Sequence, residues 1–252
     1  MGDLQGRVAL VTGSSRGIGA AIARLFASHG AGVAVHGRDV DAVESVSRQI
    51  ELAGGRALAT SCDLTCFDQI QLLEARIEEG LGPVDVLVAN AGGSTVRPGL
   101  VDELSEADWQ HSIDVNLTAT FLTIKAFLPG MKRRGRGNII TVSSAAARRP
   151  TVQSPIAYAA AKAGIEVLTR ELALQVGPSG IRANCIAPET ILTERNQQQI
   201  PASMQEQLGR VHPIPRLGTP EDVAEAARFL ASERSAWISG IVLDVAGGSV
   251  LA

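Results

Sequence analysis

Thr12-Gly-Ser-Ser-Arg-Gly-Ile-Gly19 is a glycine-rich stretch between an apolar run, 7–11, and an amphipathic segment, 20–29. A turn of this kind between a strand and a helix predicts a diphosphate site, because small residues let the backbone approach the ligand and the helix N-terminus offers free N–H donors. The spacing Gly-x3-Gly-x-Gly differs from the Gly-x-Gly-x-x-Gly fingerprint, and no Gly-Lys-Ser/Thr follows, which disfavours a P-loop. By themselves the glycines fit a plain strand–turn–helix equally well, since Gly is also the usual turn residue.

Short apolar runs alternate with helix-length segments along the whole chain. Further strands are predicted at 33–35, 56–59, 84–88, 138–142, 181–186 and 241–245. Further helices are predicted at 40–53, 67–79, 105–132, 156–176 and 220–231. Nearly all strand residues are apolar, as in a sheet that is buried on both faces. The pattern predicts an α/β fold: one Rossmann-like, doubly wound parallel sheet of about seven strands, with helices on both faces, over a single domain 1–252.

The segment 189–217 interrupts this alternation. It is polar and rich in Gln, and it contains Pro201, Pro213 and Pro215. We predict an irregular, mobile substrate flap over the carboxyl ends of the strands, where open α/β sheets bind their ligands. A plain surface insertion is the alternative interpretation.

Composition and charge narrow the class of protein. A chain of 252 residues with 45% hydrophobic and 19% charged residues can bury a large core within one α/β domain. The net charge of -3 gives no basic field for nucleic acid, and the short basic run 132–136 is interpreted as a solvated helix end. The three cysteines show no metal-ligand pattern and suit a reducing compartment. With no secretory segment and no apolar run of about 18 residues, we expect a cytoplasmic protein without metal, membrane or nucleic-acid partners.

A second group of reactive side chains begins with Tyr158 and Lys162. Their four-residue spacing on a predicted helix places the phenol and the ammonium on one face. A nearby cation favours the phenolate, so the pair is expected to exchange protons with an alcohol or carbonyl oxygen. Ser143-Ser144 closes a predicted strand and places a hydroxyl beside the same crevice. Spacing alone is weak evidence, because Tyr and Lys recur at this interval on many helices.

Taken together, these motifs resemble those of the short-chain dehydrogenase/reductase family over essentially the whole chain. The stretch 12–19 matches the family's cofactor motif, Asp63-Leu64 its adenine-side acidic position, and Asn90-Ala91-Gly92 most of its Asn-Asn-Ala-Gly motif. The segments 216–224 and 240–243 resemble its carboxyl-terminal signature. Four residues match its catalytic tetrad: Asn116, Ser144, Tyr158 and Lys162.

The resemblance implies a role for each residue. Tyr158 is expected to act as general acid/base on the substrate oxygen, and Ser144 to stabilise charge on that oxygen. Lys162 is expected to hold the nicotinamide ribose and lower the Tyr158 pKa, while Asn116 positions a water. The hydride comes from the nicotinamide, so no metal is required. The expected cofactor contacts are Gly13, Ser15, Arg16, Gly17, Ile18, Gly19, Arg38, Asp63, Leu64, Asn90, Ala91, Gly92, Tyr158, Lys162, Pro188, Ile191 and Thr193.

The sequence departs from the family pattern at four places. Ala89 replaces the first Asn of the Asn-Asn-Ala-Gly motif. The interval from Ser144 to Tyr158 is one residue longer than usual, so Ser143 is a second candidate for the catalytic hydroxyl. Glu189 stands where the family usually has Gly, which leaves two possibilities: a carboxylate that touches substrate or one that turns to solvent. Ala246 replaces a common Asp, and we assign no chemical consequence to this change.

Cofactor choice depends on the end of the second strand. NAD-dependent relatives carry an acid there that binds the adenosine ribose. This chain has Gly37 at that position with Arg38 beside it, and Arg16 adds a second cation. Two guanidinium groups facing one 2′-phosphate favour NADP(H). The alternative is that both arginines are simply solvated, which Asp39 favours.

The predicted function is an NADP(H)-dependent oxidoreductase that interconverts a carbonyl and a secondary alcohol of a small molecule. The alternatives are a 3-oxoacyl-(acyl-carrier-protein) reductase, whose acidic carrier would need basic surface such as 132–136, and a non-catalytic dinucleotide sensor, against which the complete tetrad argues. The helices 105–132 and 156–176 are apolar on more than one side, which predicts that a partner subunit covers them, and the family resemblance implies a homotetramer. Candidate pocket residues are Gly93, Ser94, Thr95, Val96, Arg148, Arg149, Gln153, Ser154 and the segment 189–217.

Overall fold

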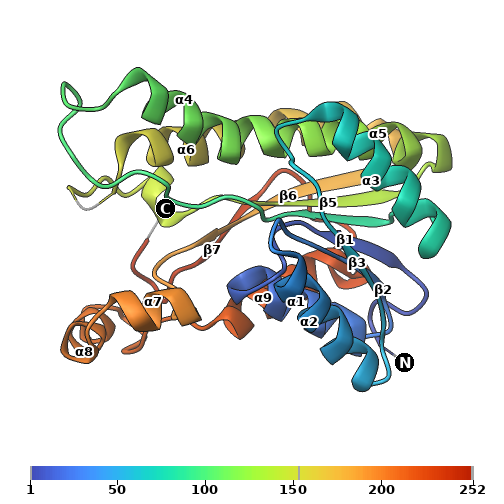
Figure 1. Cartoon of the computed structure of the whole chain (residues 1–252), viewed down its shortest axis with the longest axis horizontal. Coiled ribbons are helices and arrows are strands. Elements are labelled where there is room, and N and C mark those ends of the chain that lie inside the picture. The colour runs from blue at the N-terminus through green and yellow to red at the C-terminus, as the bar shows by residue number, and fades with distance from the viewer. Residues whose placement is uncertain (1, 153, 251–252) are drawn as a thin grey trace.

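A seven-stranded parallel sheet is the middle layer of the computed structural model, which describes residues 2–152 and 154–250 (Figure 1). The strands are β1 Val8–Val11, β2 Gly32–His36, β3 Arg56–Thr60, β4 Val86–Ala89, β5 Gly137–Val142, β6 Ile181–Pro188 and β7 Val242–Val245. Their order is β3-β2-β1-β4-β5-β6-β7. From β1 the chain adds β2 and β3 on one side of the sheet and then β4 to β7 on the other side. The order of addition thus reverses between β1 and β4, and such a switch point opens a crevice at the carboxyl ends of these strands. The predicted doubly wound parallel sheet is confirmed, while the pocket candidate Gln153 lies outside the described residues.

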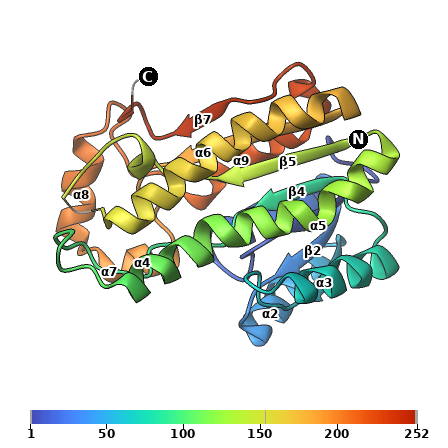
Figure 2. The same cartoon turned by 90° about the horizontal axis from the view of Figure 1, so that it is seen from above.

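Helices cover both faces of the sheet. They are α1 Gly17–Ser28, α2 Val40–Leu52, α3 Phe67–Gly80, α4 Glu106–Ile113, α5 Ala119–Arg134, α6 Ile156–Val176, α7 Glu194–Gln199, α8 Ala202–Arg210 and α9 Pro220–Ala231. Figure 1 shows α1, α2 and α9 below the sheet and α3 to α6 above it. Figure 2 shows α7 and α8 at the end to which the strand arrows point. None of the helices in the described residues is both long and apolar enough to cross a membrane.

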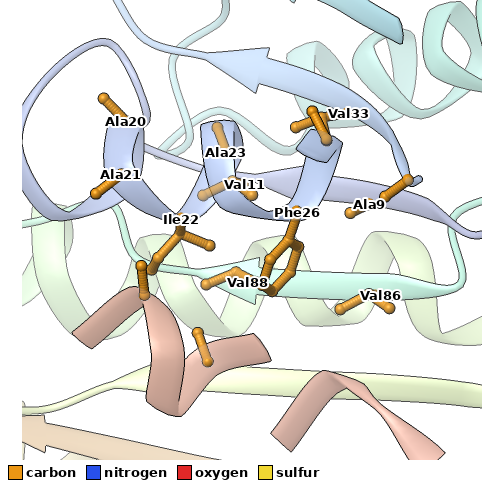
Figure 3. Close-up of a cluster of buried hydrophobic side chains, with 14 of the residues drawn as sticks. Ala9, Val11, Ala20, Ala21, Ile22, Ala23, Phe26, Val33, Val86 and Val88 are labelled. Atoms are coloured by element: carbon orange, nitrogen blue, oxygen red, sulfur yellow. The ribbon is translucent and has the colours of Figure 1, made fainter. Parts of the chain in front are cut away.

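The alternation of strand side chains divides the core into two clusters. Ala9 and Val11 of β1 pack with Ile22 and Phe26 of α1 on one face (Figure 3). Val8 and Leu10 point to the other face, where the apolar residues of α3, α5 and α6 gather. This two-sided burial explains the continuous apolar strands of the sequence.

The periodicity predicts one uninterrupted helix over the segment 105–132, but the structure divides this segment. It consists of α4, a π-helical turn at Asp114–Thr118, and α5. A π turn inserts an extra residue without breaking the helical course, so the apolar pattern continues through it. The basic run lies at the end of α5, as predicted. The helix stops after Arg134 because Gly135 adopts a left-handed conformation (φ 63°) there.

The segment 189–217 is also more regular than predicted, since it contains α7 and α8. Thr193 caps α7 by accepting a hydrogen bond from the Asn196 amide (3.3 Å), and Pro201 precedes α8. Proline disrupts helix interiors but is compatible with a helix start, so Pro201 permits a second helix here. Throughout, we call 189–217 the flap.

Candidate active site

Tyr158 and Ser144 meet at the carboxyl end of β5. Ser144 is the second residue after the strand, and Tyr158 lies in the first turn of α6. The Ser144 hydroxyl hydrogen-bonds the Tyr158 phenol, and it also accepts from the Ala146 amide (3.2 Å). Burial raises the pKa of Tyr158, and the hydrogen bond with Ser144 partly opposes this. The two predicted residues therefore share one hydrogen-bonded site.

Lys162 lies one helical turn beyond Tyr158 and is buried. Its Nζ is 5.7 Å from the Tyr158 ring centroid and donates a hydrogen bond to the Val142 carbonyl (2.7 Å). Burial lowers the pKa of Lys162 to about 8. The structure does not show the expected lowering of the Tyr158 pKa by this ammonium: desolvation raises that pKa, and the contact that opposes the rise is the hydrogen bond with Ser144.

Ser143 does not compete with Ser144 for the phenol. Its single hydroxyl proton is shared between the Lys162 carbonyl oxygen (2.9 Å) and Glu166 Oε1 (3.1 Å), beneath the site. The β-strand alternation separates neighbouring serines in this way, since successive side chains point to opposite faces. The geometry selects Ser144 over Ser143 as the hydroxyl that faces Tyr158.

Asn116 lies on the π turn and is completely buried. Its amide donates to the carbonyls of Ser112 (2.9 Å) and Gly93 (3.1 Å), and its Oδ1 accepts from the Gly93 amide (2.9 Å). The π turn, which packs against α6, thus ties Asn116 to the loop after β4. That loop carries Gly92, where a β-carbon would approach Asn116 Oδ1 to 2.5 Å.

The glycine turn is built for close backbone approach. A β-carbon on Gly19 would lie 2.3 Å from the Gly13 carbonyl oxygen, and Gly13 and Gly17 have positive φ angles of 64° and 55°. Asn90 braces the turn by donating to the carbonyls of Thr12 (2.9 Å) and Gly13 (3.1 Å). The first turn of α1 has neither an acidic residue nor a side-chain cap. These features fit a bound diphosphate, because they leave the positive helix end available to an anion.

The flap begins beside this turn. A β-carbon on Gly17 would lie 3.2 Å from Thr193 Cγ2. Ile191 is buried and pairs with Gly218 in an isolated bridge, and Pro188 ends β6. Three predicted cofactor residues, Pro188, Ile191 and Thr193, are therefore at the same edge of the sheet as the glycine turn.

Charged groups gather at the end of β2. Arg16 forms an ion pair with Asp39, whose carboxylate also caps α2 by accepting from the Ala42 amide (3.1 Å). Asp63 accepts hydrogen bonds from Thr65, which lower its pKa, and the charge of Arg38 lowers it further. Ser15 lies against Gly37, where a β-carbon would meet Ser15 Oγ at 3.0 Å. The predicted adenosine contacts thus lie together, but Arg16 already has an acidic partner.

Arg148 was a candidate substrate ligand, and the structure gives it two acidic partners instead. It pairs with Glu166 (3.1 Å) and with Asp244 of β7. Arg149 is exposed. Sequence reasoning missed Glu166, although it lies one turn beyond Lys162 on the same helix face. Glu189 neither turns to solvent nor stands free for substrate, because it hydrogen-bonds His212 (2.7 Å).

The basic run 132–136 lies at the wrong edge of the sheet to serve the site. Arg134 donates to the Val84 carbonyl (2.6 Å), and Arg136 pairs with Asp85 (3.2 Å), at the amino ends of the strands. The site lies at the other end of the six-residue strand β5, about 20 Å away. Figure 2 shows the end of α5 at the opposite side from α7 and α8.

Comparisons with known proteins match nearly the whole chain. A family model described as enoyl-(acyl carrier protein) reductase matches residues 13–249. Glucose 1-dehydrogenase 2 of Bacillus subtilis (strain 168) is 39% identical over 252 residues, which cover 99% of this chain and 96% of that protein.

Solved structures agree with this match. A 7 alpha-hydroxysteroid dehydrogenase in complex with NADH and 7-oxo glycochenodeoxycholic acid has a TM-score of 0.92 at 36% identity, covering 99% of this chain and 96% of the other. A 3-oxoacyl-[acyl-carrier protein] reductase from Brucella melitensis has a TM-score of 0.92 at 35% identity, covering 99% and 93%.

Proposed function

The chain belongs to the short-chain dehydrogenase/reductase family, and we propose that it is an NADP(H)-dependent oxidoreductase that interconverts a carbonyl and a secondary alcohol. The observation that carries the proposal is the hydrogen bond between Ser144 and Tyr158 beside the buried Lys162. The related dehydrogenases act on hydroxyl and carbonyl groups, which is the chemistry that this trio can serve.

Tyr158 is the proposed proton donor during reduction and the acceptor during oxidation. Ser144 holds the same substrate oxygen and stabilises negative charge as it develops there. The nicotinamide, when bound, supplies or accepts the hydride. Burial of the phenol keeps Tyr158 protonated before reaction, which suits a group that must donate.

Lys162 and Asn116 support this chemistry. Lys162 is proposed to bind the nicotinamide ribose, and its lowered pKa allows it to exchange a proton near neutral to mildly basic pH. Asn116 is proposed to hold a water that links Lys162 to solvent; its carbonyl oxygen and amide are fixed by Gly93 and Ser112.

The residues fit a nicotinamide dinucleotide, with the diphosphate over the glycine turn, where Gly13, Gly17 and the start of α1 are free of crowding β-carbons. The absence of a carboxylate at Gly37 and the exposed Arg38 favour the 2′-phosphate of NADP(H). The ion pair of Arg16 with Asp39 opposes this choice, because a phosphate must compete with the carboxylate. The related hydroxysteroid dehydrogenase was solved with NADH.

The relatives include a hydroxysteroid dehydrogenase, a glucose dehydrogenase and a 3-oxoacyl-[acyl-carrier protein] reductase, so the candidate substrates are a steroid, a sugar and an acyl thioester. An acyl carrier protein that docked on the basic run 132–136 would face the amino ends of the strands, away from Tyr158. We therefore favour a free small molecule over a carrier-bound acyl chain. We also propose a homotetramer and, from the free thiols Cys62, Cys66 and Cys185, a cytoplasmic location.

A carbonyl panel tests the function. Purified wild type and Tyr158→Phe are mixed with NADPH or NADH and with keto steroids, keto sugars and short 3-oxoacyl thioesters, and cofactor oxidation is followed. Tyr158→Phe should lower kcat by roughly 10²–10⁴-fold while cofactor affinity stays near normal. A wild-type rate in this variant would refute the mechanism, and cofactor binding without turnover of any carbonyl would favour the non-catalytic sensor.

A further inference from the structure

His212 follows α8 and is buried, with 5% of its side chain exposed. Its Nδ1 lies 2.6 Å from the Leu208 carbonyl oxygen, and its Nε2 lies 2.7 Å from Glu189 Oε2. Both partners are oxygen acceptors. A neutral imidazole has only one N–H, so two such contacts require an additional proton on the pair.

The surroundings of Glu189 suit an acceptor. Glu189 also accepts hydrogen bonds from the amide and the hydroxyl of Thr190, which stabilises its carboxylate form. Both contacts are satisfied at once when the imidazole carries an N–H on each ring nitrogen and donates to the carboxylate and to the main-chain carbonyl.

Glu189 and His212 join two different parts of the chain. Glu189 follows the last residue of β6, whereas His212 lies beyond both flap helices, so their contact closes the segment 190–211 into a loop. The pair lines a cavity of about 530 Å³ together with residues of β7 and the loop after it. A β-carbon on Gly247 of that loop would lie 3.4 Å from the His212 ring.

The other charged groups around this cavity have their own partners. Arg216 pairs with Asp222 (2.6 Å), Asp244 pairs with Arg148, and Arg210, on α8, pairs with Glu206 (2.5 Å). Glu189 is therefore the charge that faces His212 directly.

We propose that Glu189 and His212 are positioning residues that form a proton-dependent latch, which holds the flap at the carboxyl end of β6. An imidazole with a single N–H can donate to Glu189 or to the Leu208 carbonyl but not to both, so one of the two contacts is lost when the second N–H is lost as pH rises. Thr193, four residues beyond Glu189 in the flap, lies next to Gly17, so the same segment is in contact with the glycine turn and with the latch. Any effect on cofactor affinity rests on the proposed function, whereas the latch itself does not.

Substitution of Glu189 by Gln gives a sharp test. The Gln amide can donate to Nε2 of a neutral imidazole while Nδ1–H donates to the Leu208 carbonyl, so Glu189→Gln completes the latch without the extra proton. Glu189→Ala removes the contact. Glu206→Gln, which changes a carboxylate within α8, is the matched control.

The readout is amide hydrogen exchange of 194–211, corrected for intrinsic rates, between about pH 5.5 and 8.5. Protection in wild type and Glu206→Gln should fall by on the order of tenfold as pH rises, and protection in Glu189→Gln should stay nearly constant. Protection in Glu189→Ala should be lower than in wild type at about pH 5.5 and should change little with pH. Wild-type protection that does not change with pH, or equal pH dependence in Glu189→Gln, would overturn the proposal. Exchange needs neither cofactor nor turnover, so the result stands even if the proposed reductase activity fails.

Discussion

Ser143 donates a hydrogen bond to Glu166 across 3.1 Å, and this contact turns its hydroxyl away from Tyr158. Glu166 is in turn paired with Arg148 (3.1 Å), which follows the 3-10 turn after Ser144. The two neighbouring serines consequently have different surroundings: Ser143 belongs to a buried ion-pair network, whereas Ser144 faces the phenol. This difference can be measured.

Ser144→Ala and Ser143→Ala should separate chemistry from stability. Ser144→Ala removes the hydroxyl that holds the substrate oxygen, so kcat should fall by about 10²–10³-fold with little change in the free energy of unfolding. Ser143→Ala removes a buried hydrogen bond to a carboxylate, so it should lower the free energy of unfolding by about 1–3 kcal/mol with a much smaller change in kcat. Steady-state kinetics and urea unfolding check both; a larger loss of kcat in Ser143→Ala would reverse the assignment.

We expect Lys162 to lower the free energy of unfolding although the proposed reaction needs it. Because burial lowers its pKa from 10.5 to about 8, the unfolded chain binds more protons than the folded one between these values, and the free energy of unfolding gains from this group as pH rises through that window. Below this pH window Lys162 is charged in the folded protein, and desolvation of the buried ammonium lowers the free energy of unfolding by its full amount. Lys162→Met should therefore raise the free energy of unfolding by roughly 1–3 kcal/mol at neutral pH while abolishing activity. Urea unfolding at about pH 7 and 10 checks this; a gain that grew with pH would contradict it.

Local patterns predicted residues that the structure brings together in the candidate site, whereas contacts between residues far apart in the sequence could not be predicted. The glycine turn and the Tyr158/Lys162 pair are contiguous or one helical turn apart, so their spacing carries the geometry. By contrast, Arg148 meets Asp244 across 96 residues and His212 meets Glu189 across 23. Only the folded sheet brings such partners together. The π turn around Asn116 escaped prediction because the helix continues on both sides of it.

The proposed tetramer predicts an interface on the face that carries α5 and α6 (Figure 2). Phe121, Val167 and Leu174 are 46%, 55% and 75% exposed there, which a partner subunit would cover. Val167→Glu should convert the tetramer to a smaller species by light scattering at micromolar concentration. Leu52→Glu, at an 82% exposed position of α2 on the other face, is the matched control and should stay tetrameric. A wild-type protein that is only monomeric would reject the assembly.

Asp39 should weaken NADPH binding by holding Arg16. Asp39→Asn removes the charge that pairs with Arg16 but keeps an oxygen that can cap α2, since Asn is as good an N-cap as Asp. The exposed pair has a small energy, so NADPH affinity should rise only about two- to fivefold, with no gain for NADH. Fluorescence titration of both cofactors checks this, and an equal gain for both would show that Arg16 does not read the phosphate.

Cofactor preference should depend on Arg38 and Gly37. If Arg16 and Arg38 each contribute about 1–2 kcal/mol to binding of the 2′-phosphate after solvent screening, NADPH should be preferred over NADH by on the order of 30- to 1,000-fold. Gly37→Asp with Arg38→Ile should reverse most of this, because a carboxylate accepts the ribose hydroxyls and repels the phosphate. A β-carbon on Gly37 would lie 2.9 Å from Val43 Cγ2 and 3.0 Å from Ser15 Oγ, so Gly37→Ala with Arg38→Ile is the control for crowding. Dissociation constants of both cofactors are measured at one fixed ionic strength. Equal wild-type affinities, or a preference that neither double variant changes, would show that the arginines face solvent and that the NADP(H) assignment is wrong.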